Sequence, residues 1–153
     1  MRFVGIDIGA ERHMVASIDE QSTVLQRPTA FREDAEGYQQ LIGLLGPPAG
    51  TLIVMEATGH YWQNLFAMLA AEGFVIALIN PLRTRRFAEE DLVRTKTDAI
   101  DALGLARFGQ QKRPPATLLP ESQRGICASS SVCGPASSRT LATARGSSIG
   151  WSI

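Results

Sequence analysis

Four acidic residues stand where their neighbours suggest a chemical role. Asp7 lies in the middle of an apolar segment near the N-terminus, and Glu56 directly follows four apolar residues. Asp98 and Asp101 are three residues apart, a spacing that places both on one face of a helix. Mg²⁺ prefers carboxylate oxygens, and two divalent ions about 4 Å apart can bind the attacking and leaving oxygens of a phosphodiester. The four acids therefore predict a metal site for attack on a phosphodiester by water or a hydroxyl group.

Each acid also has a structural interpretation. Asp98 near the start of a helix would be stabilised by the helix dipole, Asp101 could be a solvated surface residue, and Glu56 could cap the helix that follows it. Asp7 is the hardest to explain in this way. A carboxylate among strand-core residues is costly unless it is paired, hydrogen-bonded or bound to a metal. The spacing alone leaves both interpretations open.

The hydrophobic pattern predicts an α/β fold with a mixed sheet. Residues 2–9, 13–19 and 23–30 alternate like the strands of an antiparallel meander. Residues 51–55 and 74–79 are short apolar runs, which are typical of buried parallel strands. Because Glu56 ends the first of these runs, it is expected at the carboxyl edge of the sheet, where open α/β sheets bind ligands.

Helical spacing accounts for the segments between and after these strands. Asp34 is predicted as an N-cap, and Gly46 with the prolines after it ends that helix. A second helix is expected from about residue 60 to residue 72, with Thr58 as its cap and Gly73 as its stop. Two further helices are predicted over about 82–91 and 97–108.

The last 32 residues differ in composition from the rest of the chain. Residues 122–153 contain nine serines, four glycines and no acid, and they show no sustained apolar period. We expect one folded domain over residues 1–121, followed by a disordered or out-of-frame tail. No apolar run approaches the roughly 18 residues of a membrane span, and the two cysteines form no disulfide framework, so the cytoplasm is the expected compartment.

The net charge of zero means that any nucleic-acid interaction must depend on a local cluster of cations. Basic residues gather after the last predicted strand, and a shared face would let them neutralise backbone phosphates. A solvated helix of mixed charge is the alternative. The candidate nucleic-acid-binding residues are Arg83, Arg85, Arg86, Arg94 and Lys96.

Three motifs in this order resemble the N-terminal domain of the DEDD-type insertion-sequence transposases, the group related to the Piv DNA invertase. They are Val-Gly-Ile-Asp-Ile-Gly at 4–9, Met-Glu-Ala-Thr-Gly-His-Tyr-Trp at 55–62 and Arg-Thr-Lys-Thr-Asp-Ala-Ile-Asp-Ala at 94–102. Asn80-Pro81 followed by Arg85, Arg86 and Phe87 also fits the family pattern. The resemblance covers roughly residues 2–121.

The resemblance implies a fold like ribonuclease H and the RuvC resolvases, with a five-stranded mixed sheet flanked by helices. It implies that Asp7, Glu56, Asp98 and Asp101 form a catalytic tetrad that binds Mg²⁺, with Mn²⁺ as an alternative ion. It further implies DNA strand cleavage and transfer during transposition of a mobile element, with DNA as the partner. Some members of the family use a guide RNA encoded by the element, and the full-length proteins are expected to be homo-oligomers.

One departure from the family pattern limits these expectations. Family members continue after the region matching Glu121 into a second domain that carries a nucleophilic serine, whereas residues 122–153 match nothing there. None of the tail serines can be assigned that role, so the chain is interpreted as a transposase fragment whose full activity is doubtful. A non-catalytic nucleic-acid-binding remnant is the competing interpretation.

Two further alternatives concern single motifs. Residues 5–9 also resemble the first phosphate loop of actin-like and sugar-kinase-like ATPases, but the second Asp-x-Gly-Gly loop of that superfamily is missing. His60 follows the Glu56 motif and could contact the site or a phosphate, or be a surface histidine at the start of a helix. Tyr61 and Trp62 could stack on bases, and the sequence leaves Tyr61 open. Trp62 has helical spacing with Phe66, which favours a core position.

Overall fold

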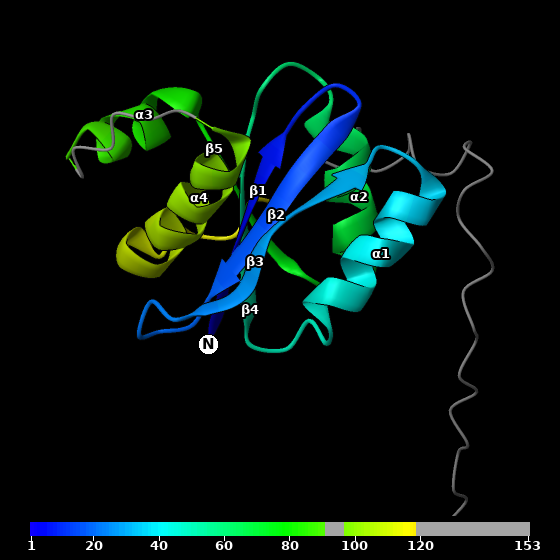
Figure 1. Cartoon of the computed structure of the whole chain (residues 1–153), viewed down its shortest axis with the longest axis horizontal. Helices are drawn as coiled ribbons and strands as arrows, with labels where there is room; N and C mark the ends of the chain where they lie inside the picture. The colour runs from blue at the N-terminus through cyan, green and yellow to red at the C-terminus, as the bar shows by residue number, and fades with distance from the viewer. Residues whose placement is uncertain (91–96, 119–153) are drawn as a thin grey trace, which may run out of the picture.

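The computed structural model describes residues 1–90 and 97–118, and its centre is a five-stranded sheet in the order β3-β2-β1-β4-β5 (Figure 1). The elements along the chain are β1 (Arg2–Ile8), β2 (Arg12–Ile18), β3 (Val24–Arg32), α1 (Ala35–Leu45), β4 (Thr51–Glu56), α2 (Trp62–Ala71), β5 (Val75–Ile79), α3 (Pro81–Glu90) and α4 (Asp98–Lys112). The predicted tail at 122–153, Arg94 and Lys96 lie outside the described residues.

The sheet is mixed, as the hydrophobic pattern predicts. β1 pairs antiparallel with β2, and β2 pairs antiparallel with β3. β1 pairs parallel with β4, and β4 pairs parallel with β5. The carboxyl ends of β1, β4 and β5 therefore meet at one edge of the sheet, which is the upper edge in Figure 1.

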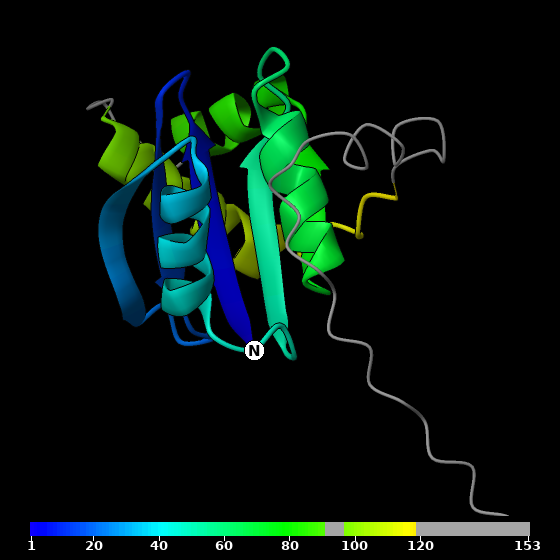
Figure 2. The same ribbon diagram turned by 90° about the vertical axis from the view of Figure 1, so that its right-hand side faces the viewer.

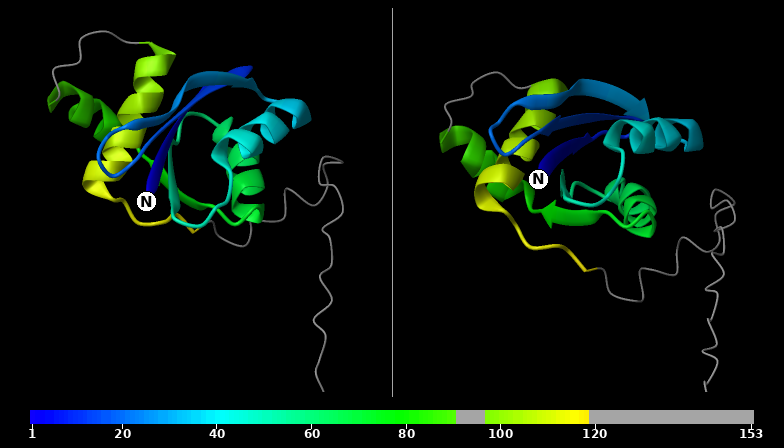
Figure 3. Two further views of the ribbon diagram at one scale, coloured as in Figure 1. Left: turned by 60° about the horizontal axis from the view of Figure 1, so that its bottom comes forward. Right: turned by 90° about the horizontal axis from the view of Figure 1, so that it is seen from below.

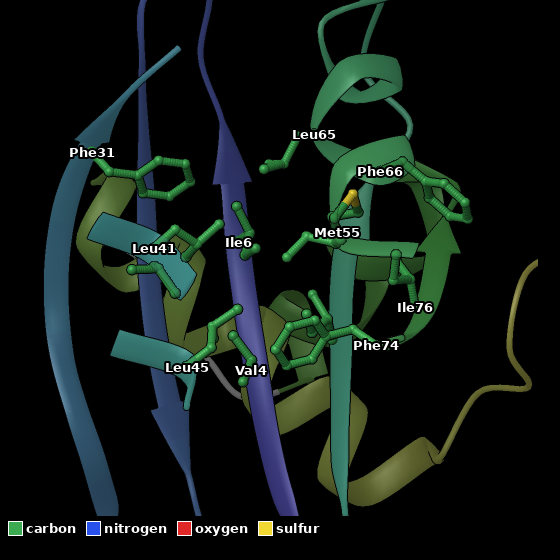
Figure 4. Packing of buried hydrophobic residues seen from close by; sticks show 13 residues of the cluster. Val4, Ile6, Phe31, Leu41, Leu45, Met55, Leu65, Phe66, Phe74 and Ile76 are labelled. Atoms are coloured by element: carbon green, nitrogen blue, oxygen red, sulfur yellow. The ribbon is translucent and has the colours of Figure 1, made fainter. Parts of the chain in front are cut away.

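Each face of the sheet has its own hydrophobic core. Helices α1 and α2 cover one face, where Val4, Ile6, Ile53 and Met55 pack against side chains such as Leu41 (Figures 2 and 4). Helix α4 covers the other face, and Figure 3 shows the sheet between the two layers from below. The core under α4 includes Phe3, Leu52, Val54, Leu105 and Phe108.

Helix α4 lies very close to β1 because β1 carries a glycine at the contact. A Cβ atom added to Gly5 would lie 1.9 Å from the carbonyl oxygen of Ala102 and 2.5 Å from the backbone nitrogen of Ala106. No side chain larger than hydrogen fits in this space unless the helix moves. Gly5 thus sets how closely the first turns of α4 approach β1.

The predicted caps differ in outcome. Asp34 caps α1 as predicted, since its side chain accepts a hydrogen bond from the backbone nitrogen of Gly37 at 2.8 Å. The prediction that Thr58 caps the next helix is wrong. Its backbone nitrogen bonds back to the carbonyl oxygen of Glu56, and α2 begins only after Tyr61, which provides no side-chain cap. A tight turn after β4 therefore delays the start of α2.

The segment after α4 runs along the free edge of β5. The backbone nitrogen of Thr117 bonds to the carbonyl oxygen of Ile76 at 2.7 Å, and the Thr117 hydroxyl accepts from the backbone nitrogen of Leu78 at 2.9 Å. Pro114 is buried in the same segment. In residues 1–90 and 97–118, no helix has the length and apolar character needed to cross a bilayer.

Candidate metal and nucleic-acid site

Asp7 and Glu56 lie next to each other at the carboxyl edge of the sheet. Ile6 pairs with Met55 in the parallel register of β1 and β4, so the two acids follow at adjacent positions. Ile6 and Met55 belong to the core under α1 and α2. Since side chains alternate along a strand, both acids project from the face that α4 covers. Each acid is partly exposed.

The other two acids lie in the first turn of α4. The Thr97 hydroxyl caps this helix by accepting from the backbone nitrogen of Ile100 at 3.2 Å. Asp101 is half-buried and directly precedes Ala102, the residue whose carbonyl oxygen lies against Gly5. Asp98 is exposed one turn earlier. The contact between α4 and β1 therefore brings these acids toward the strand end that carries Asp7.

Asp7 and Glu56 share one end and one face of the sheet, and Asp98 and Asp101 lie in the first turn of the helix that covers this face, but the structure does not arrange the four as a ready metal site. Within residues 1–90 and 97–118, no group of three or more His, Cys, Asp or Glu side chains is placed to hold a metal ion. Their donor chemistry still fits a hard cation, because every candidate ligand is a carboxylate. Binding of such an ion would require the side chains to move together.

One neighbour of the site was not found by the sequence patterns. The hydroxyl of Thr84 on α3 hydrogen-bonds to Oε1 of Glu56, and it also lies 2.9 Å from the carbonyl oxygen of Pro81. Thr84 is buried, as is Phe87 three positions later, whereas the arginines around them are exposed. Thr84 and Phe87 are uncharged residues three positions apart in a basic helix, a spacing that indicates the inward face of the helix. This spacing could have identified Thr84 from the sequence.

Three of the five predicted nucleic-acid-binding residues lie on α3. Arg83, Arg85 and Arg86 are all exposed. Arg85 pairs with Glu89 one turn later at 3.4 Å, with both side chains largely in solvent. Helix α3 is held against α4 by Phe87, which meets the ring of Phe108 edge-on at 5.4 Å. Helix α3, which carries these arginines, lies at the same end of the sheet as the carboxyl ends of β1 and β4 (Figure 1).

The two histidines of the chain belong to different surroundings. His13 is buried on the face opposite the acids, where its Nε2 atom contacts the carboxylate of Glu33, which also accepts a hydrogen bond from the hydroxyl of Tyr38. This cluster joins β2 to α1 and takes no part in the acidic edge. His60 is exposed in the loop after Glu56, at the acidic edge itself.

Solved structures with a similar arrangement define the class of fold. RuvC of Thermus thermophilus matches 76% of this chain and 100% of its own length, with a TM-score of 0.51 and 12% identity. RuvC of T. thermophilus in complex with a Holliday junction substrate matches 74% of this chain and 95% of its own length, with a TM-score of 0.51 and 14% identity. The fold is RuvC-like, which confirms the expectation from the motifs.

The family is shown by sequence comparison. The family model for DEDD transposases of the IS110 type, described as a transposase, matches residues 4–125. The pilin gene-inverting protein of Moraxella bovis is 38% identical over 117 residues, which cover 74% of this chain and 35% of that protein. The mini-circle putative transposase for IS117 of Streptomyces coelicolor is 35% identical over 111 residues, covering 69% of this chain and 26% of that protein.

The chain belongs to the DEDD transposase family of the IS110 type. It spans about a third of the length of the M. bovis relative.

Proposed function

We propose that this chain is the RuvC-like domain of a DNA transposase or site-specific recombinase, and that its acidic edge supports Mg²⁺-dependent cleavage and transfer of DNA strands. One observation carries the proposal. Asp7 and Glu56 occupy adjacent positions on parallel strands, on the face covered by the helix that carries Asp101 and Asp98. Family membership supports the same reaction class.

The four carboxylates would hold the metal, with Mn²⁺ as an alternative ion. When bound, Mg²⁺ would activate the attacking oxygen and stabilise the leaving oxygen of the phosphodiester. Asp7 is positioned by the pairing of β1 with β2 and Glu56 by the pairing of β4 with β5, whereas Asp101 and Asp98 depend on the placement of α4. Thr84 orients Glu56 through its hydroxyl group.

DNA is the proposed partner of the adjoining surface. Arg83, Arg85 and Arg86 are exposed on α3, with the Arg83 guanidinium 5.9 Å from the centre of the Phe108 ring. They would neutralise backbone phosphates without reading the base sequence. Arg94 and Lys96 remain candidates by sequence. The names of the relatives favour inversion or transposition of DNA by the complete protein. A guide RNA and a homo-oligomer remain expectations that come from the family resemblance, and a cytoplasmic place of action remains an expectation that comes from the apolar runs and cysteines of the sequence.

A second candidate function is nucleic-acid binding without catalysis. It is favoured by the absence, within the described residues, of three acidic or other ligating side chains already placed around one point. In that case the arginines of α3 would bind DNA and the acids would not bind metal. Metal binding therefore distinguishes the two candidates.

The test is a calorimetric titration of the full chain with Mg²⁺ and Mn²⁺. Wild type should bind at least one ion, and Asp7→Asn should remove that binding while leaving the domain folded, because it removes a central charged ligand. Glu72→Gln is the matched control, since Glu72 is an exposed acid at the far end of α2. A folded wild type that binds neither ion, or an Asp7→Asn variant that binds normally, would contradict the metal site.

A further inference from the structure

Two aromatic side chains beside the acidic edge make no contribution to the core. The rings of His60 and Tyr61 form a tilted pair, with centroids 4.5 Å apart and planes inclined by 31°. Both residues are exposed, and Tyr61 exposes 42% of its surface. Within the part of the chain that the structure describes, neither ring has a hydrogen-bond partner. Trp62 differs, because it packs edge-on against Phe66 at 5.9 Å.

The loop that carries this pair is held in place by backbone hydrogen bonds. Ala57 donates to the carbonyl oxygen of Ile79 at 3.0 Å, which extends the pairing of β4 with β5. The indole nitrogen of Trp62 donates to the carbonyl oxygen of Gly59 at 3.1 Å, and Gly59 has the positive φ of 58° that this turn requires. The exposed rings are therefore presented by an ordered turn that is anchored in the sheet and in the core.

The position of the pair relates it to the acids and to the arginines. His60 and Tyr61 follow Glu56 by four and five residues, so they lie at the edge where β1 and β4 end. Figures 1 and 2 show the β4–α2 loop at the same end of the sheet as α3. The first turn of α2, which follows directly, contains no acidic residue that would repel a polyanion.

We propose that His60 and Tyr61 form a stacking platform for an unpaired nucleobase of the DNA strand bound at the acidic edge; this inference rests on the proposed function. Aromatic faces stack on any base, because every base has a π face. A base inside a duplex has both faces covered by its neighbours, so the platform binds only a base that is single-stranded or displaced from its stack. The arginines bind the phosphates, and the platform adds a preference for strands with free bases.

The experiment measures DNA binding by the full chain in EDTA, so that it does not depend on the metal site. Fluorescence anisotropy measures the affinity for three labelled DNA molecules: an oligothymidylate, an abasic strand of equal length and a duplex. A length of about 12 nucleotides lies within the usual range of single-strand site sizes. Tyr61→Ala removes the ring, and Tyr61→Phe keeps it. Gln63→Ala is the control, because it changes an exposed side chain in the first turn of α2.

Wild type should bind the oligothymidylate more tightly than the abasic strand. Tyr61→Ala should weaken binding of the oligothymidylate about 5- to 140-fold and leave the abasic strand and the duplex unchanged. Tyr61→Phe and Gln63→Ala should behave as wild type. Equal affinity of wild type for both strands, no binding at all, or equal losses on both strands in Tyr61→Ala would overturn the platform. The metal titration would still decide the function of the acids, so the two failures are distinguishable.

Discussion

The Glu56 carboxylate depends on a neighbour from a different element. Thr84, which is buried on α3, donates its hydroxyl hydrogen toward Oε1 of Glu56, which is partly exposed. Hydrogen bonds to charged groups contribute about 1.5–3 kcal/mol, more than those between neutral groups. The bond also restricts the rotamers of an acid that is a proposed metal ligand. Thr84 is therefore a positioning residue for Glu56.

Replacing this hydroxyl should be measurable in a single variant. Thr84→Val should lower the free energy of unfolding by about 1.5–3 kcal/mol, because the shape is kept and the charge-assisted bond is lost. Thr84→Ser should restore most of that loss. Urea denaturation measures both variants. Thr51→Val is the control. Thr51 is a buried residue of β4, the strand that ends at Glu56, and its hydroxyl makes only a long 3.4 Å hydrogen bond to the carbonyl oxygen of Pro47. Equal stability of Thr84→Val and wild type would contradict a role for the bond.

At the level of secondary structure, α4 determines whether the acids share one site. Its inner surface packs on β1 and β4 through residues such as Leu105 and Phe108, and its first turn carries two of the four acids. Its C-terminal half is tied to the β2–β3 turn, because Gln110 donates to the carbonyl oxygen of Glu20 at 2.8 Å. The helix is thus attached at both ends of the sheet, and Gly5 sets its distance from β1.

A methyl group at the contact should push α4 away from the sheet. Gly5→Ala should destabilise the domain by about 1–3 kcal/mol or more, as overpacking does, and should weaken metal binding because Asp101 moves with the helix. Gly104→Ala on the same helix is the control, because a Cβ atom there meets nothing within 4 Å. Its expected effect is a slight gain of helix stability. Thermal unfolding and the metal titration report the two effects, and a Gly5→Ala variant with wild-type behaviour in both would refute the close contact.

At the scale of the whole molecule, the sheet, both cores and the acidic edge can be described from residues 1–90 and 97–118. Residues 113–118 complete the free edge of β5 through the two hydrogen bonds of Thr117. The family model matches as far as residue 125. The folded unit and the proposed site are therefore expected to be independent of the serine-rich segment at 122–153.

Two truncations test this expectation. Deleting residues 122–153 should change Tm by less than about 3 °C, which corresponds to less than about 1 kcal/mol for a domain of this size. Deleting residues 114–153 should lower Tm clearly, because it removes buried Pro114 and the Thr117 bonds to β5. Differential scanning calorimetry compares both with the full chain. A large drop on the shorter deletion would show that the tail packs on the domain.

Much of the architecture could be predicted from local patterns. Period-two alternation, short apolar runs and helical spacing identified the five strands and four helices, and Asp34 marked the start of α1. The predicted ends of α2, α3 and α4 differ from the observed ends by one to four residues. The cap predicted at Thr58 was wrong because a turn bonded to Glu56 occupies that position. The motifs around Asp7, Glu56 and Asp101 identified the family, which the comparisons confirm.

Contacts between distant segments could not be predicted in the same way. The sequence alone specifies which elements form, because hydrophobic period, caps and turn residues act within a few positions of each other. Strand register and the pleat decided that Asp7 and Glu56 are neighbours on the face under α4. Packing decided that Thr84 reaches Glu56 and that Tyr61 is exposed, whereas the contact of Trp62 with Phe66 followed from their helical spacing. These outcomes depend on the simultaneous placement of segments far apart in the chain, which no local pattern records.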